Sequence, residues 1–242
     1  MKHLFLADTH LSDPADPVYR QVMNLLEEHT GQLRTLVLLG DIFEFWIGYR
    51  HVVFSSYVPL LEKLRQLREA GTQLVFVEGN HDFHLGPYFR DILDCRILPD
   101  GGPLELDGRR IFLTHGDLVN PHDKGYRRLR RVLRHPLTRR LLSWIPPDAA
   151  WAVARRASRL SARKGNGRQR RRIPDEALLA FARERFEEGY DTVITGHFHV
   201  PLQRCRDGQS LLALGDWSHG PSYILLEQGA FTCYPGAPST SP

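Results

Sequence analysis

Apolar residues fall into short runs, separated by longer stretches in which they recur every three or four positions. Five of the short runs have strand length and are rich in β-forming residues: KHLFLA, TLVLLG, QLVFVEG, RRIFLTH and DTVITG. Helical spacing between them is clearest from Tyr57 to Ala70 and from Pro174 to Gly189. Strands that alternate with helices in this way predict an α/β fold.

The spacing changes downstream of His199. Four closely spaced strands are predicted there, LQRCRD, SLLALGD, SYILLE and AFTCYP, with Asp-Gly, Gly-Pro and Gln-Gly turns between them. We expect these strands to form a second sheet that packs against the first.

Length and composition are those of a globular protein. The 242 residues suit a single domain, or a domain with an insertion, and 42% hydrophobic with 25% charged residues exclude general disorder. The apolar runs are too short for a bilayer-spanning helix. Asp8 and His10 also interrupt the first residues before the apolar segment of a secretory signal can form. We therefore expect a cytoplasmic protein.

Positive charge is concentrated in one part of the chain. Between Lys124 and Arg172 there are 17 Lys and Arg residues and one acid, Asp148, whereas the remainder holds 15 basic and 27 acidic residues. Apolar residues recur among these arginines at helical spacing: Leu129, Val132, Leu133, Leu137, Leu141, Leu142, Trp144 and Ile145. The pattern predicts a helical, Arg-rich insertion at residues 120–173 of a single domain, 1–242. Such a charge indicates an anion, a nucleic acid or an acidic membrane surface nearby.

The cysteines give no sign of a metal or disulfide framework. Cys95, Cys205 and Cys233 are odd in number, widely spaced and without a CxxC pair. We expect them to be buried free thiols.

Polar motifs follow the apolar strands. In chain order they are Asp8-Thr9-His10, Gly40-Asp41, Gly79-Asn80-His81-Asp82, His115-Gly116-Asp117 and Gly196-His197-Phe198-His199. Because the carboxyl ends of strands gather at one edge of an α/β sheet, these motifs can meet there. Residues i and i+2 of an extended segment point to one side, so both members of a DxH or HxH pair can address one site.

Seven of these residues are candidate metal ligands: Asp8, His10, Asp41, Asn80, His115, His197 and His199. Carboxylate and amide oxygens with imidazole nitrogens, and no thiolates, suit Mn²⁺, Fe²⁺, Zn²⁺, Co²⁺ or Mg²⁺. A single ion cannot use seven ligands. With one bridging carboxylate they fit two ions about 3.5 to 4 Å apart, the spacing of two-metal phosphoryl-transfer sites.

The ordered signature DxH, GDxx, GNH(D/E), GH and GHxH across residues 8–199 resembles that of the calcineurin-like metallophosphoesterase superfamily. The resemblance implies an αββα sandwich of two mixed sheets and two divalent ions, of which Mn²⁺ is the one we expect. It further implies two ligand sets that share Asp41 as the bridge: Asp8, His10, Asp41 and His199 for one ion, and Asp41, Asn80, His115 and His197 for the other.

Four features resemble, more narrowly, the UDP-2,3-diacylglucosamine hydrolases of lipid A biosynthesis. They are GDIFEFWIG at 40–48, GNHDFHLG at 79–86, HGDLVNPHDKGYRRLRR at 115–131, and a basic helical insertion ahead of GHFH. Enzymes of that family cut the pyrophosphate of a UDP-linked diacylated sugar, release UMP and an acylated sugar 1-phosphate, and work at the inner face of the membrane. The resemblance implies this substrate and peripheral contact with an anionic membrane, without a stable protein partner.

One position departs from that family, which typically has Arg after the Asn where this chain has His81. The exact substrate therefore stays open. The resemblance implies catalytic roles for His81, Asp41 and Asn80. It also implies a substrate-binding set: Asn80, His81, Asp123, Tyr126, Ser161, Asn166, Arg168 and His197.

Three acids are expected to orient these groups. We expect Asp82 to orient the His81 ring, so that His81 can donate a proton to the leaving oxygen or hold a phosphoryl oxygen. We expect Asp117 and Glu44 to orient metal ligands. The alternatives are a plain hydrogen bond from His81 to a loop carbonyl, and simple loop capping by Asp117 and Glu44.

Two other classes of function remain open. A nuclease or cyclic-nucleotide phosphodiesterase would use the same metals, and the basic insertion can equally hold a phosphate backbone. The apolar residues among the arginines favour an acyl chain under a cationic rim instead. A non-catalytic scaffold would keep the fold with an eroded metal site, whereas every expected ligand is present here.

Overall fold

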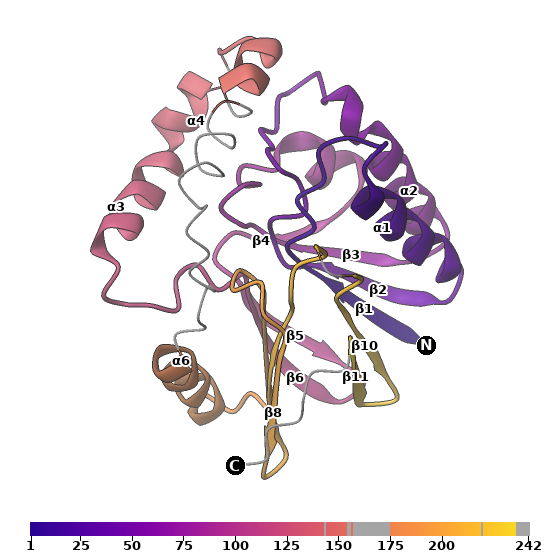
Figure 1. Ribbon diagram of the computed structural model, residues 1–242, viewed down its shortest axis with the longest axis vertical. Coiled ribbons are helices and arrows are strands. Elements are labelled where there is room, and N and C mark those ends of the chain that lie inside the picture. Colours follow the sequence, from indigo (N-terminus) through magenta and orange to yellow (C-terminus); the bar gives the residue numbers. More distant parts are fainter. Residues whose placement is uncertain (143, 154–155, 157–174, 219, 236–242) are drawn as a thin grey trace.

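The computed structural model describes residues 1–142, 144–153, 156, 175–218 and 220–235. Two β-sheets pack face to face, and helices cover their outer faces (Figure 1). The αββα sandwich of two mixed sheets is thereby confirmed. The two helices predicted most clearly are also present, as α2 (Val58–Glu69) and α6 (Asp175–Glu187).

The first sheet has six strands in the order β11-β10-β1-β2-β3-β4. Four run parallel: β1 (Lys2–Leu6), β2 (Leu33–Leu38), β3 (Gln73–Val77) and β4 (Arg96–Leu98). Two are antiparallel to their neighbours, β10 (Tyr223–Glu227) and β11 (Ala230–Tyr234). Most residues of β1, β2 and β3 are buried whichever face they point to, which is why these strands read as nearly continuous apolar runs.

The second sheet has five strands in the order β5-β6-β7-β9-β8. Its three central strands are parallel: β6 (Arg109–Thr114), β7 (Thr192–Thr195) and β9 (Gln209–Ala213). Its edge strands are antiparallel to their neighbours: β5 (Gly102–Leu106) and β8 (Leu202–Arg206).

The strands downstream of His199 do not form a sheet of their own, so that prediction is wrong. β8 and β9 join β6 and β7 in the second sheet, whereas β10 and β11 return to the first sheet. There β10 pairs with β1 from Lys2–Glu227 to Leu6–Tyr223. Without β10, one edge of the buried β1 would keep unpaired backbone N–H and C=O groups, which are costly away from water.

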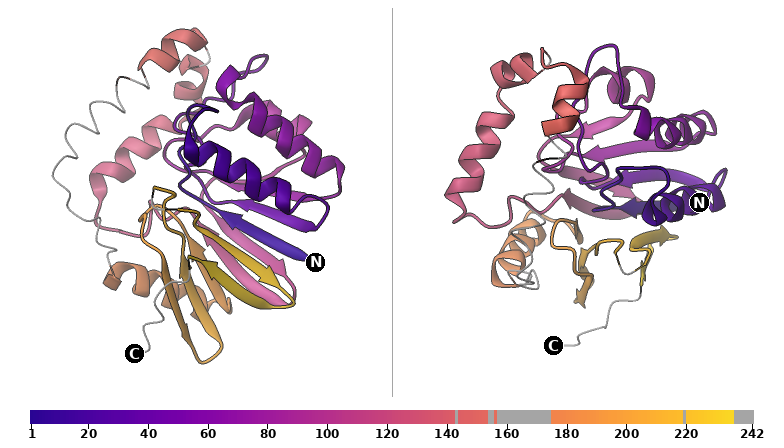
Figure 2. Two further views of the ribbon diagram at one scale, coloured as in Figure 1. Left: turned by 45° about the vertical axis from the view of Figure 1, so that its right-hand side comes forward. Right: turned by 45° about the horizontal axis from the view of Figure 1, so that its top comes forward.

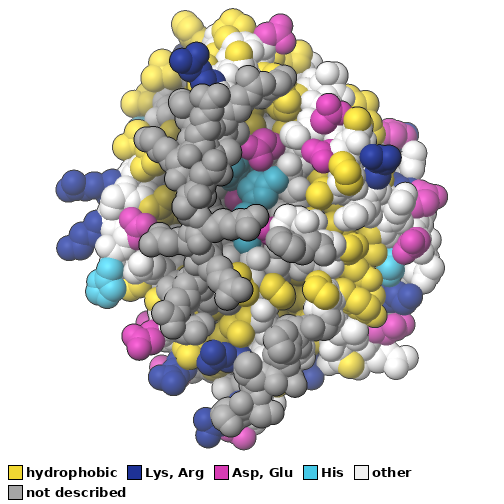
Figure 3. Space-filling model, viewed as in Figure 1, with side chains coloured by type: hydrophobic (Ala, Val, Ile, Leu, Met, Phe, Trp, Pro, Cys, Tyr) yellow, Lys and Arg dark blue, Asp and Glu magenta, His cyan; other side chains and the backbone are white. Residues whose placement is uncertain are grey.

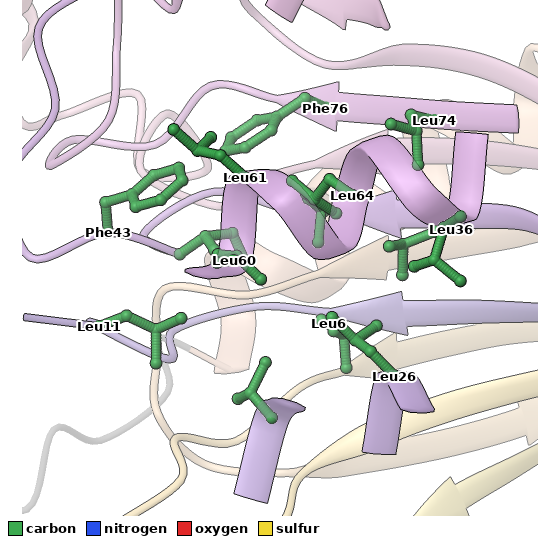
Figure 4. Close-up of a cluster of buried hydrophobic side chains, with 14 of the residues drawn as sticks. Leu6, Leu11, Leu26, Leu36, Phe43, Leu60, Leu61, Leu64, Leu74 and Phe76 are labelled. Atoms are coloured by element: carbon green, nitrogen blue, oxygen red, sulfur yellow. The ribbon is translucent and has the colours of Figure 1, made fainter. Parts of the chain in front are cut away.

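Three apolar layers hold the sandwich together. Helices α1 (Pro17–Glu28) and α2 cover the first sheet, and Figure 4 shows Leu61 and Leu64 of α2 close to the side chains of β3. Between the sheets, Phe5 and Val37 pack with side chains of the second sheet such as Leu212. On the far side, α6 packs on β7 and β9. Two short helices complete the core: η1 (Ser55–Tyr57) and the π-helix η2 (Tyr88–Ile92).

The described part of the predicted insertion is helical. It comprises α3 (Lys124–Leu133), α4 (Pro136–Leu142) and helical residues 147–153, which lie beyond the edge of the sheets (Figure 2). Ser161, Asn166 and Arg168, predicted to bind substrate, lie outside the described residues. Within the described part of the chain, no helix combines the length and apolar character needed to cross a bilayer.

Candidate metal centre

The polar motifs meet at one edge of the two sheets, each just beyond a strand: Asp8 and His10 after β1, Asp41 after β2, Asn80 after β3, His115 after β6, and His197 and His199 after β7. Ligand atoms of Asp8, His10 and His199 lie within 4.8 Å of one another, and so do those of Asp41, His115 and His197. Figure 3 shows histidine and acidic side chains together near the centre of this face. The convergence expected from the strand ends is present.

Asp41 belongs to the second of these groups and also lies beside the first. Its Oδ2 lies 3.9 Å from His10 Nε2 and 3.5 Å from His115 Nε2. Its Oδ1 accepts the backbone N–H groups of Asn80 and His81, each at 2.9 Å. The carboxylate is almost fully buried and therefore fixed between the two groups.

The ring of His115 is fixed from behind. Its Nδ1 donates to the Leu39 carbonyl at 2.8 Å, because a carbonyl oxygen can only accept. This bond turns Nε2 toward Asn80 Oδ1, which lies 3.2 Å away, and toward Asp41. Nε2 is thus the His115 atom available to an ion.

Five of the seven predicted ligands have left-handed backbone conformations. The φ angles are 52° at Asp8, 45° at His10, 53° at Asp41, 72° at His197 and 59° at His199. Asp and His are among the residues that enter this region most readily. A non-glycine residue there costs on the order of 1–3 kcal/mol and persists only where its surroundings fix it. The sharp turns after β1, β2 and β7 bring the side chains to one place.

The backbones of the loops after β2 and β3 also come into close contact at this edge. Gly40 has a φ of +84°, and a Cβ there would lie 2.7 Å from both Gly79 Cα and His115 Nδ1. A side chain at residue 40 would therefore push apart the loops that carry Asp41 and Asn80.

Asp82 supports the backbone rather than the ring of His81, contrary to our expectation. Its buried carboxylate accepts the N–H groups of Asp41 (2.9 Å) and Gly79 (3.0 Å), and also those of the two residues after Asp41. His81 Nδ1 instead donates to the Glu44 carbonyl at 2.8 Å, the loop-carbonyl alternative. Burial and the nearby charge of Asp41 raise the pKa of Asp82 to about 7.

The Glu44 side chain lies beside His10. Its Oε2 is 3.5 Å from His10 Nδ1, and His10, Glu44 and His81 form a third group of atoms within 4.8 Å. Glu44 thus stands where a residue that orients a ligand ring would stand.

Asp216 is a functional candidate that the sequence reasoning missed. Its Oδ2 lies 3.2 Å from His199 Nδ1, while its Oδ1 accepts the Ser218 hydroxyl at 2.7 Å. Burial opposes ionisation, but the bonds from His199 and Ser218 lower the pKa of Asp216 to about 2. The signal was available, because Gly215-Asp216 follows β9 as Gly40-Asp41 follows β2.

Asp117 ties α3 to the sheet edge. It accepts the Tyr126 hydroxyl at 2.6 Å and the Nε of Arg130 at 2.8 Å. Asp123 is the N-cap of α3 and accepts the Tyr126 N–H at 2.9 Å. The substrate-binding roles of Asp123 and Tyr126, and the ligand-orienting role of Asp117, stay predictions.

The charges in the centre depend strongly on one another. Burial raises the pKa of Asp8. Burial opposes the charge of Asp41 too, but the adjacent His115 outweighs it and lowers the pKa of Asp41. Burial likewise opposes the charge of His115, whose pKa the neighbouring Asp41 and Asp8 raise to about 10.

The arrangement fits two cations. Asp8 Oδ1 and both ring nitrogens of His10 are buried and have no hydrogen-bond partner among the described residues, which is rare for buried polar atoms. Asp8 Oδ1 lies 3.6 Å from His199 Nε2, too far for a hydrogen bond. An ion that both atoms coordinate would fill this separation. The oxygen and nitrogen donors suit divalent ions such as Mn²⁺.

Comparisons with known proteins agree with this geometry. The calcineurin-like phosphoesterase family model matches residues 1–201. UDP-2,3-diacylglucosamine hydrolase of Pseudomonas paraeruginosa is 34% identical over 235 residues, covering 90% of this chain and 91% of the relative. The Pseudomonas aeruginosa protein of that name is 33% identical over 221 residues, with coverage of 90% and 91%. The solved structure of an archaeal phosphodiesterase is similar in fold, with 16% identity, a TM-score of 0.50, and coverage of 96% and 98%.

Proposed function

Because this chain belongs to the calcineurin-like phosphoesterase family and is a metal-dependent hydrolase, we propose that it hydrolyses the pyrophosphate of UDP-2,3-diacylglucosamine to UMP and 2,3-diacylglucosamine 1-phosphate. The observation that carries the proposal is the position of Asp41, which belongs to one ligand group with His115 and also lies beside His10 of the other. Similarity to hydrolases of that substrate over nine-tenths of the chain supports the choice of substrate.

In the proposed site, two sets of residues hold the ions: Asp8, His10, Asp41 and His199, and Asp41, Asn80, His115 and His197. Mn²⁺ is the proposed native ion. The pair of cations, when bound, supplies positive charge for the phosphoryl oxygens and lowers the pKa of a water molecule in the site.

His81 is the proposed proton donor. Its Nδ1 donates to the Glu44 carbonyl, so Nδ1 carries the hydrogen and Nε2 is the atom left for substrate. In the charged ring Nε2 donates, either to a phosphoryl oxygen or to the leaving oxygen. The backbone bond from His81 N–H to Asp41 keeps the ring beside the metal ligands.

The basic helices are the proposed membrane contact. Leu137, Leu141 and Trp144 are 64%, 68% and 78% exposed, and Arg139 and Arg140 stand among them. Apolar and basic side chains adjoin near the top of Figure 3, where Figure 1 places α4. An amphipathic surface of this kind binds anionic lipid, the environment of a diacylated substrate.

The test compares three substrates in the presence of Mn²⁺ or Mg²⁺: UDP-2,3-diacylglucosamine, bis(p-nitrophenyl) phosphate and single-stranded DNA. We expect UMP release from the lipid, with no release by an Asp41→Ala variant. Efficient cleavage of DNA with the lipid left intact would reject the substrate and favour a nuclease. Fewer than two occupied metal sites at saturating Mn²⁺, together with no turnover of any of the three, would favour a scaffold.

A further inference from the structure

Arg134, at the junction of α3 and α4, reaches back to the loop that carries Asn80. It is the C-cap residue of α3, and its side chain is only 13% exposed. Nη1 donates to Glu78 Oε2 and to the Pro99 carbonyl, each at 2.7 Å. Nη2 donates to the Gly79 carbonyl at 3.0 Å, and the guanidinium carbon lies 5.7 Å from the centre of the Phe83 ring.

The Gly79 carbonyl belongs to the same peptide group as the Asn80 N–H. That N–H donates to Asp41 Oδ1 at 2.9 Å. A charged donor on the carbonyl polarises the peptide group and strengthens the bond that its N–H makes on the other side. Arg134 is therefore linked to the proposed bridging carboxylate through one peptide unit.

Two further contacts keep this peptide in place. Glu78, the residue before Gly79, is held by Arg134 on one carboxylate oxygen and accepts the Leu85 N–H on the other at 3.2 Å. The Gly79 N–H donates to Asp82 at 3.0 Å. Both backbone groups of Gly79 are thus hydrogen-bonded to side chains: its C=O accepts from Arg134, and its N–H donates to Asp82.

We propose that Arg134 is a positioning residue, which through the Gly79–Asn80 peptide fixes Asn80 and Asp41 for the ions and makes the α3–α4 junction part of the metal site's support. The inference rests on the proposed two-metal phosphoesterase function and adds a residue to it. Arg134 acts through this peptide, since its guanidinium binds Glu78, Pro99 and Gly79 and none of the predicted metal ligands.

The test uses the full chain and the soluble substrate bis(p-nitrophenyl) phosphate. In Arg134→Met we expect kcat to fall by ~10–100-fold, as for other groups that orient metal ligands, while KM changes little. The Mn²⁺ concentration for half-maximal activity rises. Arg134→Lys regains part of the loss, since one ammonium group can bind the carbonyl but lacks the planar fork that also holds Glu78.

An amide NMR spectrum reports directly on the Asn80 N–H. We expect the position of this resonance to be unaffected by a loosening of α3 alone. We expect the Asn80 N–H resonance to shift upfield in Arg134→Met, because a weaker hydrogen bond shields the proton. Arg130→Met is the matched control. Arg130 leaves the same helix to bind Asp117 and Asp100, and so tests the anchoring of α3.

Two outcomes would overturn the proposal. One is a kcat and an Mn²⁺ response in Arg134→Met equal to those of the unmodified chain. The other is an equal loss and an equal Asn80 shift in Arg130→Met, which would trace the effect to helix anchoring. If the unmodified chain turned over no substrate, the proposed function would fail, and Mn²⁺ calorimetry with the NMR shift would still decide the role of Arg134.

Discussion

The edge that carries the metal centre and the helices α3 and α4 both depart from the usual pattern of apolar residues inside and charged residues outside. The edge buries charged side chains, whereas the helices expose apolar ones. At the edge, the carboxylates of Asp8, Asp41 and Asp82 are buried at 1% exposure or less. On the helices, Leu137 and Leu141 stand in solvent. Charge inside a protein is costly unless something neutralises it, and exposed apolar surface that is contiguous usually has a partner. The buried carboxylates suit the two divalent ions that this family uses, whereas the exposed leucines belong to the surface proposed to contact a membrane.

The largest effect is expected where the buried charge is shared. Asp41→Ala should lower turnover of any phosphodiester substrate by on the order of 10³-fold or more, because it removes a contact to both ligand groups. Steady-state kinetics at saturating Mn²⁺ measures the loss, and circular dichroism checks that the fold is kept. Activity near that of the unmodified chain would contradict this account, because the site would then not depend on a carboxylate shared by both ions.

Removing the cations should have the same effect without a mutation. We expect EDTA treatment followed by gel filtration to abolish turnover, and added Mn²⁺ to restore it. The titration measures both stoichiometry and activity. Turnover that persisted in metal-free protein would contradict the need for cations at the buried carboxylates.

A smaller effect is expected at Asp216, which contacts a predicted metal ligand rather than the ions themselves. Asp216→Asn keeps the shape but weakens the bond to His199 Nδ1, and should raise the Mn²⁺ requirement or lower kcat by ~10–100-fold. Asp207→Asn is the matched control, because Asp207 is exposed in the β8–β9 turn. Equal metal dependence in both variants would remove Asp216 from the site.

Polar substitution on the helices should affect membranes and leave the chemistry intact. We expect Leu137→Ser with Leu141→Ser to weaken binding to anionic vesicles by ~10-fold, since about 1–2 kcal/mol of apolar burial is lost. Turnover of bis(p-nitrophenyl) phosphate should not change. Vesicle co-sedimentation measures binding, and Val58→Ser, exposed on α2, is the control. Full vesicle binding by the double variant would show that this surface has another partner.

The smallest effect is expected at the start of α3. Asp123→Ala removes the N-cap bond to the Tyr126 N–H and should cost about 1 kcal/mol, confined to the first turn. Hydrogen exchange of the amides from Lys124 onward measures this local loss. If turnover of soluble substrate fell instead, the predicted substrate contact at Asp123 would be favoured over capping.

The sequence predicted what local rules determine. Strand-end placement was enough to bring Asp8, Asn80 and His115 together, because parallel strands deliver their carboxyl ends to one edge. Helix α2 followed from apolar spacing to within one residue at each end. The cysteine prediction held only in part, since Cys95 is buried but Cys205 is exposed.

Contacts between distant residues were beyond these rules. The basic segment read as uncompensated, yet Arg134 pairs with Glu78, 56 positions away. The partners of Asp82 and the return of β10 to the first sheet also depend on distant parts of the chain. Spacing along a sequence carries no information on which carboxylate a long arginine side chain will reach.

The place of β1 between β2 and β10 also orders events during biosynthesis. Asp8 and His10 leave the ribosome early, but β7 with His197 and His199, and then β10, follow much later. Because a domain generally folds as a unit, the ion pocket stays unfinished until β7 and β10 have emerged. The complete pair of ligand groups is therefore available to metal only after these strands have been made.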